Sequence, residues 1–216
     1  MNKNIYDNYL AILKEEMIPA MGCTEPIALA YGAARAREIL GKEPERITAK
    51  CSGNIIKNVR CVIIPNSGGL KGIPAGVVLG AVAGDTSLDM EVLSTVTEEG
   101  RKRCRELLDA DICKVELLDT PVVLHIIIEM QAGEDNVSLE IKYDHINVTK
   151  IIKNGEVLLD EDQALEEKEK ADRTLLDLED IREFADTVEI SDVKHLLDTQ
   201  IRSNMAIAHE GMTGKY

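Results

Sequence analysis

The sequence is poor in aromatic residues and in positive charge. Its 216 residues include no Trp and a single Phe, and aromatic side chains make up 3% of the chain. A hydrophobic core must therefore be built from Ile, Leu, Val, Ala and Met. The 39 acidic residues outnumber the 25 basic ones, which gives a net charge of −14. We therefore expect no nucleic-acid partner, because phosphate binding needs a concentrated positive surface.

The sequence also lacks a membrane span and a leader peptide. No stretch is both apolar and long enough to cross a bilayer. Residues 1–16 are amphipathic and include Asp7, Glu15 and Glu16, unlike a signal or transit peptide. We therefore expect a cytoplasmic protein without a membrane partner. The length allows one large domain or two small ones.

No two of the five cysteines stand in C-x-x-C spacing, so neither a zinc ribbon nor a locally ligated cluster is indicated. An odd number of cysteines without a leader favours reduced thiols over disulfides. We expect Cys61, Cys104 and Cys113 to be small buried hydrophobic residues, and we nominate no metal ligand.

The spacing of apolar residues and turn formers predicts an α+β fold, with a mixed or antiparallel sheet and packed helices. Helices are expected at 6–17, 27–40, 73–83, 88–108, 175–187 and 190–212, and strands at 47–52, 60–64, 112–118, 122–130, 137–143, 148–153 and 157–159. Thr24 resembles an N-cap, Gly41 a helix end, and Asn154-Gly155 a hairpin turn. His125 lies in an apolar strand and is expected to be a satisfied core residue.

Two domains are predicted. Residues 1–159 form an α+β domain, and residues 160–216 form a charged linker and the start of a helical domain. The charged run at 166–170 is expected to be a linker or a solvated helix face. Because a helical pattern continues close to the last residue, the helical segment is expected to be truncated.

Residues 21–26, MGCTEP, place a cysteine where a helix begins. Cys23 would lie beside free backbone N–H groups and the positive end of the helix dipole, both of which lower the pKa of a thiol. Glu25 would complement the same dipole, or orient the thiol and exchange protons with it. The alternative is an ordinary helix start with a buried cysteine.

Two further segments carry small polar groups. Residues 52–58, SGNIIKN, combine a hydroxyl, two amides and a lysine between expected strands, a set that can bind a carboxylate. Residues 65–74, PNSGGLKGIP, form a glycine-rich loop that opens a helix, without the Walker or dinucleotide-binding pattern. A simple polar turn is the leading alternative for each segment.

Together and in this order, the three segments resemble the L-cysteine desulfidase family, formerly an uncharacterised family similar to L-serine dehydratase alpha chains. The resemblance rests on residues 22–30 (GCTEPIALA), 52–59 (SGNIIKNV) and 64–69 (IPNSGG). It is close over roughly the first half of the chain and looser beyond. It is a resemblance to the N-terminal half only of the longer family members.

The resemblance implies a lyase that converts L-cysteine to pyruvate, ammonia and sulfide. Its cofactor would be an oxygen-sensitive 4Fe–4S cluster with one iron acting as a Lewis acid, held by ligands in the C-terminal half that this chain lacks. Cys23 and Glu25 would be catalytic, with Cys23 in an acid/base role. The residues that would bind substrate are Thr24, Asn54, Lys57, Asn58, Asn66, Ser67 and Gly68.

The chain alone is expected to be inactive without the missing half. Its expected partners are a small amino-acid substrate and a polypeptide supplying the C-terminal half, with a homo-oligomer as a further possibility. An L-serine dehydratase-like lyase is an alternative within the same class. A cluster-free module that binds a small amino acid, or a degenerate fragment, is the alternative from another class.

Overall fold

The computed structural model describes residues 1–20, 22–161 and 171–214, and the chain divides into two compact units. One unit holds residues 20–165 and the other joins residues 1–19 to 166–216. The division differs from the predicted domains, 1–159 and 160–216, because the first helix groups with the C-terminal helices. The charged run at 166–170 lies outside the described residues.

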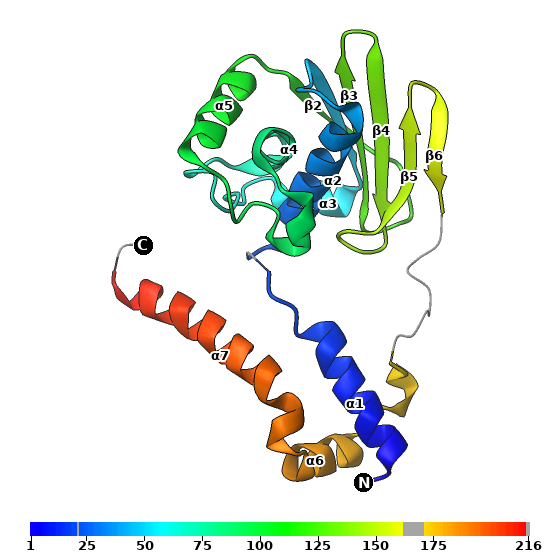
Figure 1. Ribbon diagram of the computed structural model, residues 1–216, viewed down its shortest axis with the longest axis vertical. Coiled ribbons are helices and arrows are strands. Elements are labelled where there is room, and N and C mark those ends of the chain that lie inside the picture. The colour runs from blue at the N-terminus through cyan, green and yellow to red at the C-terminus, as the bar shows by residue number, and fades with distance from the viewer. Residues whose placement is uncertain (21, 162–170, 215–216) are drawn as a thin grey trace. The chain divides into compact units, whose positions relative to one another are not determined.

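The larger unit is built on one six-stranded sheet with the order β2-β1-β3-β4-β5-β6 (Figure 1). Its strands are β1 Arg46–Cys51, β2 Cys113–Leu117, β3 His125–Ala132, β4 Asp135–Lys142, β5 Val148–Lys153 and β6 Glu156–Asp160. Strands β1 and β2 are parallel, and every other neighbouring pair is antiparallel. The predicted α+β class with a mixed sheet is confirmed.

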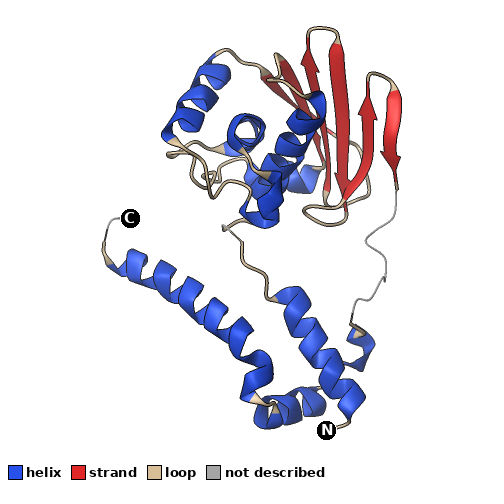
Figure 2. Cartoon of the chain, viewed as in Figure 1, coloured by secondary structure: helices blue, strands red, loops and turns tan. Residues whose placement is uncertain are grey.

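Helices cover one face of this sheet (Figure 2). They are α2 Thr24–Leu40, α3 Gly53–Val59, α4 Gly72–Ala83 and α5 Glu98–Asp109, with a 3₁₀ segment, η1 Thr86–Glu91, between the last two. Helix α2 packs on β3 and β4, and α4 packs between α2 and α5. The core between these layers is aliphatic, as the lack of aromatic residues requires.

Small residues let α2 and α4 approach closely. The positions in contact pair Gly76 with Pro26, Gly80 with Ala30 and Gly84 with Ala34. A Cβ atom on Gly80 would lie 2.2 Å from the carbonyl oxygen of Ala30, so no larger residue fits there without moving a helix. Because the offset between partners stays constant, the two helices run parallel and begin at the same end of the unit.

Several predicted boundaries are confirmed. Helix α2 ends at Gly41, whose φ of 83° is in the left-handed region. The hairpin turn between β5 and β6 uses Asn154 and Gly155, both with positive φ. The N-cap of α2 is Cys23, and Thr24 is the first helical residue, so the predicted cap was wrong by one position.

Three predicted elements were wrong. Residues 53–59, expected as a turn, form helix α3, because the Ser52 side chain accepts a hydrogen bond from the backbone N–H of Ile55 and caps it. Residues 60–64 form no strand, and only an isolated bridge joins Ile63 to Lys71. The single helix expected at 88–108 is divided between η1 and α5, which begins after the capping residue Thr97.

The smaller unit is entirely helical in its described residues. It contains α1 Lys3–Glu16, a 3₁₀ turn η2 Arg173–Leu175, α6 Leu178–Thr187 and α7 Ile190–Met212. Its core centres on Tyr9, Phe184 and Val193. The Phe184 ring lies 5.4 Å from the ring of Tyr6 and 5.5 Å from that of Tyr9, between centroids. One aromatic cluster therefore joins α1 to α6.

Candidate functional site

The candidate site lies where α2 begins, in the larger unit. Cys23, the N-cap of α2, is exposed and makes no capping hydrogen bond with its side chain. Its thiol instead donates to Glu25 Oε2 at 3.1 Å. The structure therefore brings the two predicted catalytic residues into direct contact, with the sulfur accessible.

A second predicted segment joins this pair. The side-chain amide of Asn58, near the end of α3, donates to Glu25 Oε1 at 2.9 Å. Both carboxylate oxygens of Glu25 are thus engaged, one by the thiol and one by the amide. Residues 33 positions apart in the sequence are held together by this contact, which links the GCTEP and SGNIIKN segments.

The expected lowering of the Cys23 pKa was wrong. Partial burial raises the pKa of the Cys23 thiol, and the hydrogen bond to the negative carboxylate of Glu25 raises it further. The same hydrogen bond lowers the pKa of Glu25, helped by the amide of Asn58. At neutral pH the pair therefore holds its proton on sulfur and its negative charge on the carboxylate.

His145 acts electrostatically on the pair, and no local sequence pattern predicted this. It lies in the loop between β4 and β5 and is partly buried. The hydrogen bond from Cys23 is the main cause of the lowered Glu25 pKa, and the electrostatic effect of His145 makes a smaller contribution to it. A third titratable group therefore acts on the pair from a strand loop 120 residues away in the chain.

The start of α4 lies at the same end of the unit as the pair, because α2 and α4 run parallel. Backbone contacts connect it to the residues that follow α3, since the N–H of Gly72 donates to the carbonyl of Val62 at 3.1 Å. The positive φ of Gly72, 85°, and its position against the carbonyl of Arg60 explain a glycine there. Two helix dipoles thus direct positive potential towards the same end of the unit.

The PNSGG loop uses its polar groups on the protein itself. The amide of Asn66 donates to the carbonyl oxygens of Leu93, at 2.8 Å, and Ser94, at 3.3 Å. The hydroxyl of buried Ser67 donates to the carbonyl of Leu70 at 3.2 Å. These contacts fix the loop, and substrate binding by Asn66 and Ser67 stays a prediction.

The other predicted binding residues lie in the same three segments as the pair and the loop. Thr24 and Asn54 are partly buried in the first turns of α2 and α3, and Lys57 is exposed on α3. Gly68 has a φ of 72°, and a Cβ atom there would meet the guanidinium of Arg105 at 2.7 Å. No contact joins Gly68 to the pair among the described residues, so the site proper comprises the first two segments.

The thiols of this chain do not fit a cluster. Cys51, Cys104 and Cys113 are buried, and burial raises the pKa of Cys51 and of Cys113 to about 12. The prediction of burial is confirmed for Cys104 and Cys113, but Cys61 is exposed. Within residues 1–20, 22–161 and 171–214, no three His, Cys, Asp or Glu side chains gather as a metal site would require.

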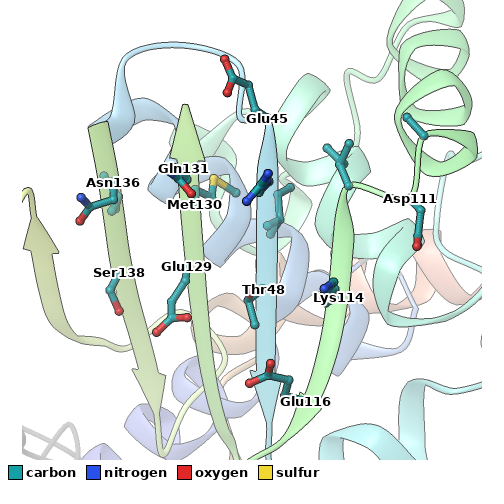
Figure 3. A pocket seen from close by; sticks show the side chains of 15 residues that line it. Glu45, Thr48, Asp111, Lys114, Glu116, Glu129, Met130, Gln131, Asn136 and Ser138 are labelled. Atoms are coloured by element: carbon teal, nitrogen blue, oxygen red, sulfur yellow. The ribbon is translucent and has the colours of Figure 1, made fainter. Parts of the chain in front are cut away.

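The sheet face opposite the helices is polar and contains a hollow of about 860 Å³. Figure 3 shows Thr48, Glu129 and Ser138 on β1, β3 and β4 in the floor of this hollow. The carboxylate of Glu129 is paired with the ammonium of Lys50 at 2.7 Å. None of the predicted site residues lines the hollow, so it is separate from the Cys23 pair.

His125 is the satisfied core histidine that was predicted. It is buried, and its ring nitrogens lie 3.0 Å from the hydroxyl of Thr120 and 2.7 Å from Glu140. With both nitrogens engaged, the ring has a structural role.

None of the described helices is both long and apolar enough to cross a membrane.

Comparison with known proteins relates the whole chain to proteins named UPF0597. It is 45% identical over 210 residues to the UPF0597 protein of Finegoldia magna, a match that covers 97% of this chain and 50% of that protein. It is 40% identical over 218 residues to the Treponema denticola protein, covering 100% of this chain and 51% of the relative. The chain therefore spans about half the length of the curated relatives it matches.

The chain therefore belongs to the UPF0597 family, and the names of its relatives state no activity. No protein-family model matches the chain, and no solved structure matches it.

Proposed function

We propose that this chain supplies the acid/base part of a lyase that degrades L-cysteine to pyruvate, ammonia and sulfide. The observation that supports the proposal most is the exposed thiol of Cys23, 3.1 Å from a Glu25 carboxylate that Asn58 also holds. Resemblance of the three segments to cysteine desulfidases provides the reaction. An L-serine dehydratase-like reaction uses the same acid/base steps with a hydroxyl as the leaving group.

The protonation states of the pair match the needs of such an elimination. The Glu25 carboxylate is the group ready to accept the α-hydrogen of the substrate as a proton, and the Cys23 thiol is ready to donate one. As the Cα–H bond breaks, its electron pair forms the Cα–Cβ double bond, and the Cβ–S bond breaks with its electrons on sulfur. Cys23 protonates the leaving hydrosulfide.

The pair then returns to its resting state without an external reagent. The proton on Glu25 passes to the Cys23 thiolate, across the hydrogen bond that already joins them. The released 2-aminoacrylate tautomerises to an imine, and water hydrolyses it to pyruvate and ammonia.

The 4Fe–4S cluster of the resembled family finds no ligand set in the described part of this chain. Residues outside this chain would therefore hold the cluster. The positive potential at the start of α2 and α4 would attract the substrate carboxylate. Because the acid/base pair and the cluster would be held by different polypeptides, this chain alone would be inactive.

The test combines the chain with a polypeptide covering the unmatched part of the Finegoldia magna relative, under anaerobic conditions with iron and sulfide. L-cysteine should then release sulfide and pyruvate, and neither polypeptide alone should do so. Cys23→Ala should lower the rate by about 100-fold or more, in the usual range for losing acid/base catalysis. Cys61→Ala, which removes an exposed thiol outside the pair, is the matched control.

The outcomes separate the alternatives. Pyruvate from L-serine with no sulfide from L-cysteine would indicate a serine dehydratase. If L-serine protects Cys23 from alkylation but neither substrate yields a product, the chain is a binding module. Full activity in Cys23→Ala, or loss of the cluster absorbance in that variant, would contradict the acid/base role.

A further inference from the structure

Helix α7 carries one continuous apolar stripe. Its members recur at intervals of three and four residues, the spacing of one helix face, and are Ile190, Val193, Leu197, Ile201, Met205, Ala208 and Met212. Polar residues such as Asp192, Thr199 and Ser203 occupy the opposite side. A helix with this pattern is stabilised by burying its stripe against another surface.

The smaller unit covers only the beginning of this stripe. Val193 is buried in the core with Tyr9 and Phe184. Beyond it the side chains are exposed, with relative accessibilities of 38% for Leu197, 58% for Ile201, 47% for Met205 and 73% for Met212. The exposed part, residues 197–212, extends over about 22 Å at the rise of an α-helix. It is long enough to serve as one side of a protein interface.

The comparison of lengths indicates what covers it. The relatives match this chain along its length and contain about as many residues again outside the match. The sequence of α7 lies within the matched region. Its exposed stripe would be explained if the unmatched half of the relatives packed against it. The length of the relatives and the exposure of the stripe indicate this partner independently of the lyase reaction.

We propose that the exposed stripe of α7, residues 197–212, is the docking surface for a polypeptide equivalent to the other half of the relatives. The partner would present an apolar surface of its own, because the stripe offers no charge within its centre at Ile201, Met205 and Ala208. This contact would join the two halves of the functional protein.

The test mixes the chain with the unmatched part of the Finegoldia magna relative and measures the complex by light scattering and titration calorimetry. A one-to-one complex is expected. Ile201→Glu with Met205→Glu should weaken the complex by about 100-fold or more, because the two side chains would be buried in the interface and the changes would place charges there. Ser203→Glu with Ala206→Glu adds the same charges at exposed positions on the opposite side of the helix, about 140–200° from Ile201, and should change the affinity less than about threefold.

Each result decides the proposal. Because Ile201, Met205, Ser203 and Ala206 are all exposed, both double variants should keep the circular dichroism and melting of the parent chain. The proposal is overturned if the parent chain forms no complex with the unmatched part of the relative, whether or not that part is folded by itself. It is equally overturned if the two double variants bind that part with the same affinity. It is also overturned if the chain forms a dimer that the Ile201 and Met205 changes abolish. A complex without sulfide release would support docking and contradict only the lyase.

Discussion

Helices α2 and α7 represent opposite extremes of packing in one chain. Ten of the 17 residues of α2 are buried, and they pack against the sheet on one side and α4 on the other. Helix α7 is longer, with 23 residues, yet Val193 is its only buried residue. The larger unit holds its own core, whereas the smaller unit leaves most of its longest apolar stripe exposed.

The difference in packing between α2 and α7 suits the two units to different functions. A rigid scaffold is needed to hold Cys23, Glu25 and Asn58 within hydrogen-bonding distance, and the packed start of α2 provides it. The exposed stripe of α7 suits association instead. Substitutions of the same type should therefore have unequal effects when they are placed in the two units.

Phe184→Ala should have the largest effect, and it should be confined to the smaller unit. The change removes the ring that packs against both Tyr6 and Tyr9, at a cost of about 3–5 kcal/mol. Hydrogen exchange should show loss of protection in α1 and α6, with β3 and β4 unchanged. Loss of protection throughout the sheet would show that the two units do not unfold separately.

Gly80→Ala should destabilise the larger unit by about 3 kcal/mol, since a Cβ atom would lie 2.2 Å from the Ala30 carbonyl oxygen. Denaturant unfolding measures this cost. The matched change, Gly211→Ala in α7, meets no atom within 4 Å and should leave stability equal or slightly higher. Equal effects of the two substitutions would mean that α2 and α4 are not packed as closely as described.

Glu25→Gln should have a small, pH-dependent effect on the larger unit. The pKa of Glu25 is lowered in the folded state, mainly by the hydrogen bond from Cys23, so ionised Glu25 stabilises the fold above its unfolded pKa. That contribution is lost as the pH falls through the folded pKa. The variant should be less stable than the parent by under about 1 kcal/mol at pH 7 and nearly equal at pH 3. A difference that grows towards pH 3 would contradict the charge assignment.

Ile201→Ser should change the stability of the isolated chain least, by within about 0.5 kcal/mol, because the side chain is already exposed. Thermal unfolding of the chain alone is the measurement. Leu29→Ser, at a fully buried position of α2, is the contrasting control and should prevent stable folding of the larger unit. A large effect of Ile201→Ser would show that the stripe is already covered within the chain.

Local signals in the sequence predicted much of the larger unit. The run from residue 24 to Gly41 and the Asn154-Gly155 turn carry their own capping and turn chemistry, so they could be placed from neighbouring residues alone. Helix α3 was missed because its capping residue, Ser52, follows a strand directly, and a seven-residue helix offers little periodicity. The grouping of α1 with α6 depends on aromatic contacts across more than 170 residues, which no local pattern reports.

The candidate site shows the same limit. The position of Cys23 at a helix start was predictable, but the sign of its pKa shift was not, because partial burial and then the hydrogen bond to the Glu25 carboxylate raise the pKa of the thiol. The contact from Asn58 and the influence of His145 arise from tertiary structure. Residue types indicated where the chemistry lies, and the geometry determined which group holds the proton.

The pH dependence of Cys23 alkylation tests the central claim most directly, with iodoacetamide as the reagent and each cysteine resolved by mass spectrometry. We predict a half-maximal rate at a pH above that of N-acetylcysteine, because burial and Glu25 raise the pKa of the thiol. In Glu25→Gln the midpoint should move to lower pH. The account would be contradicted if the midpoint were below that of N-acetylcysteine and did not change in Glu25→Gln, because Glu25 would then not hold the proton on the Cys23 thiol.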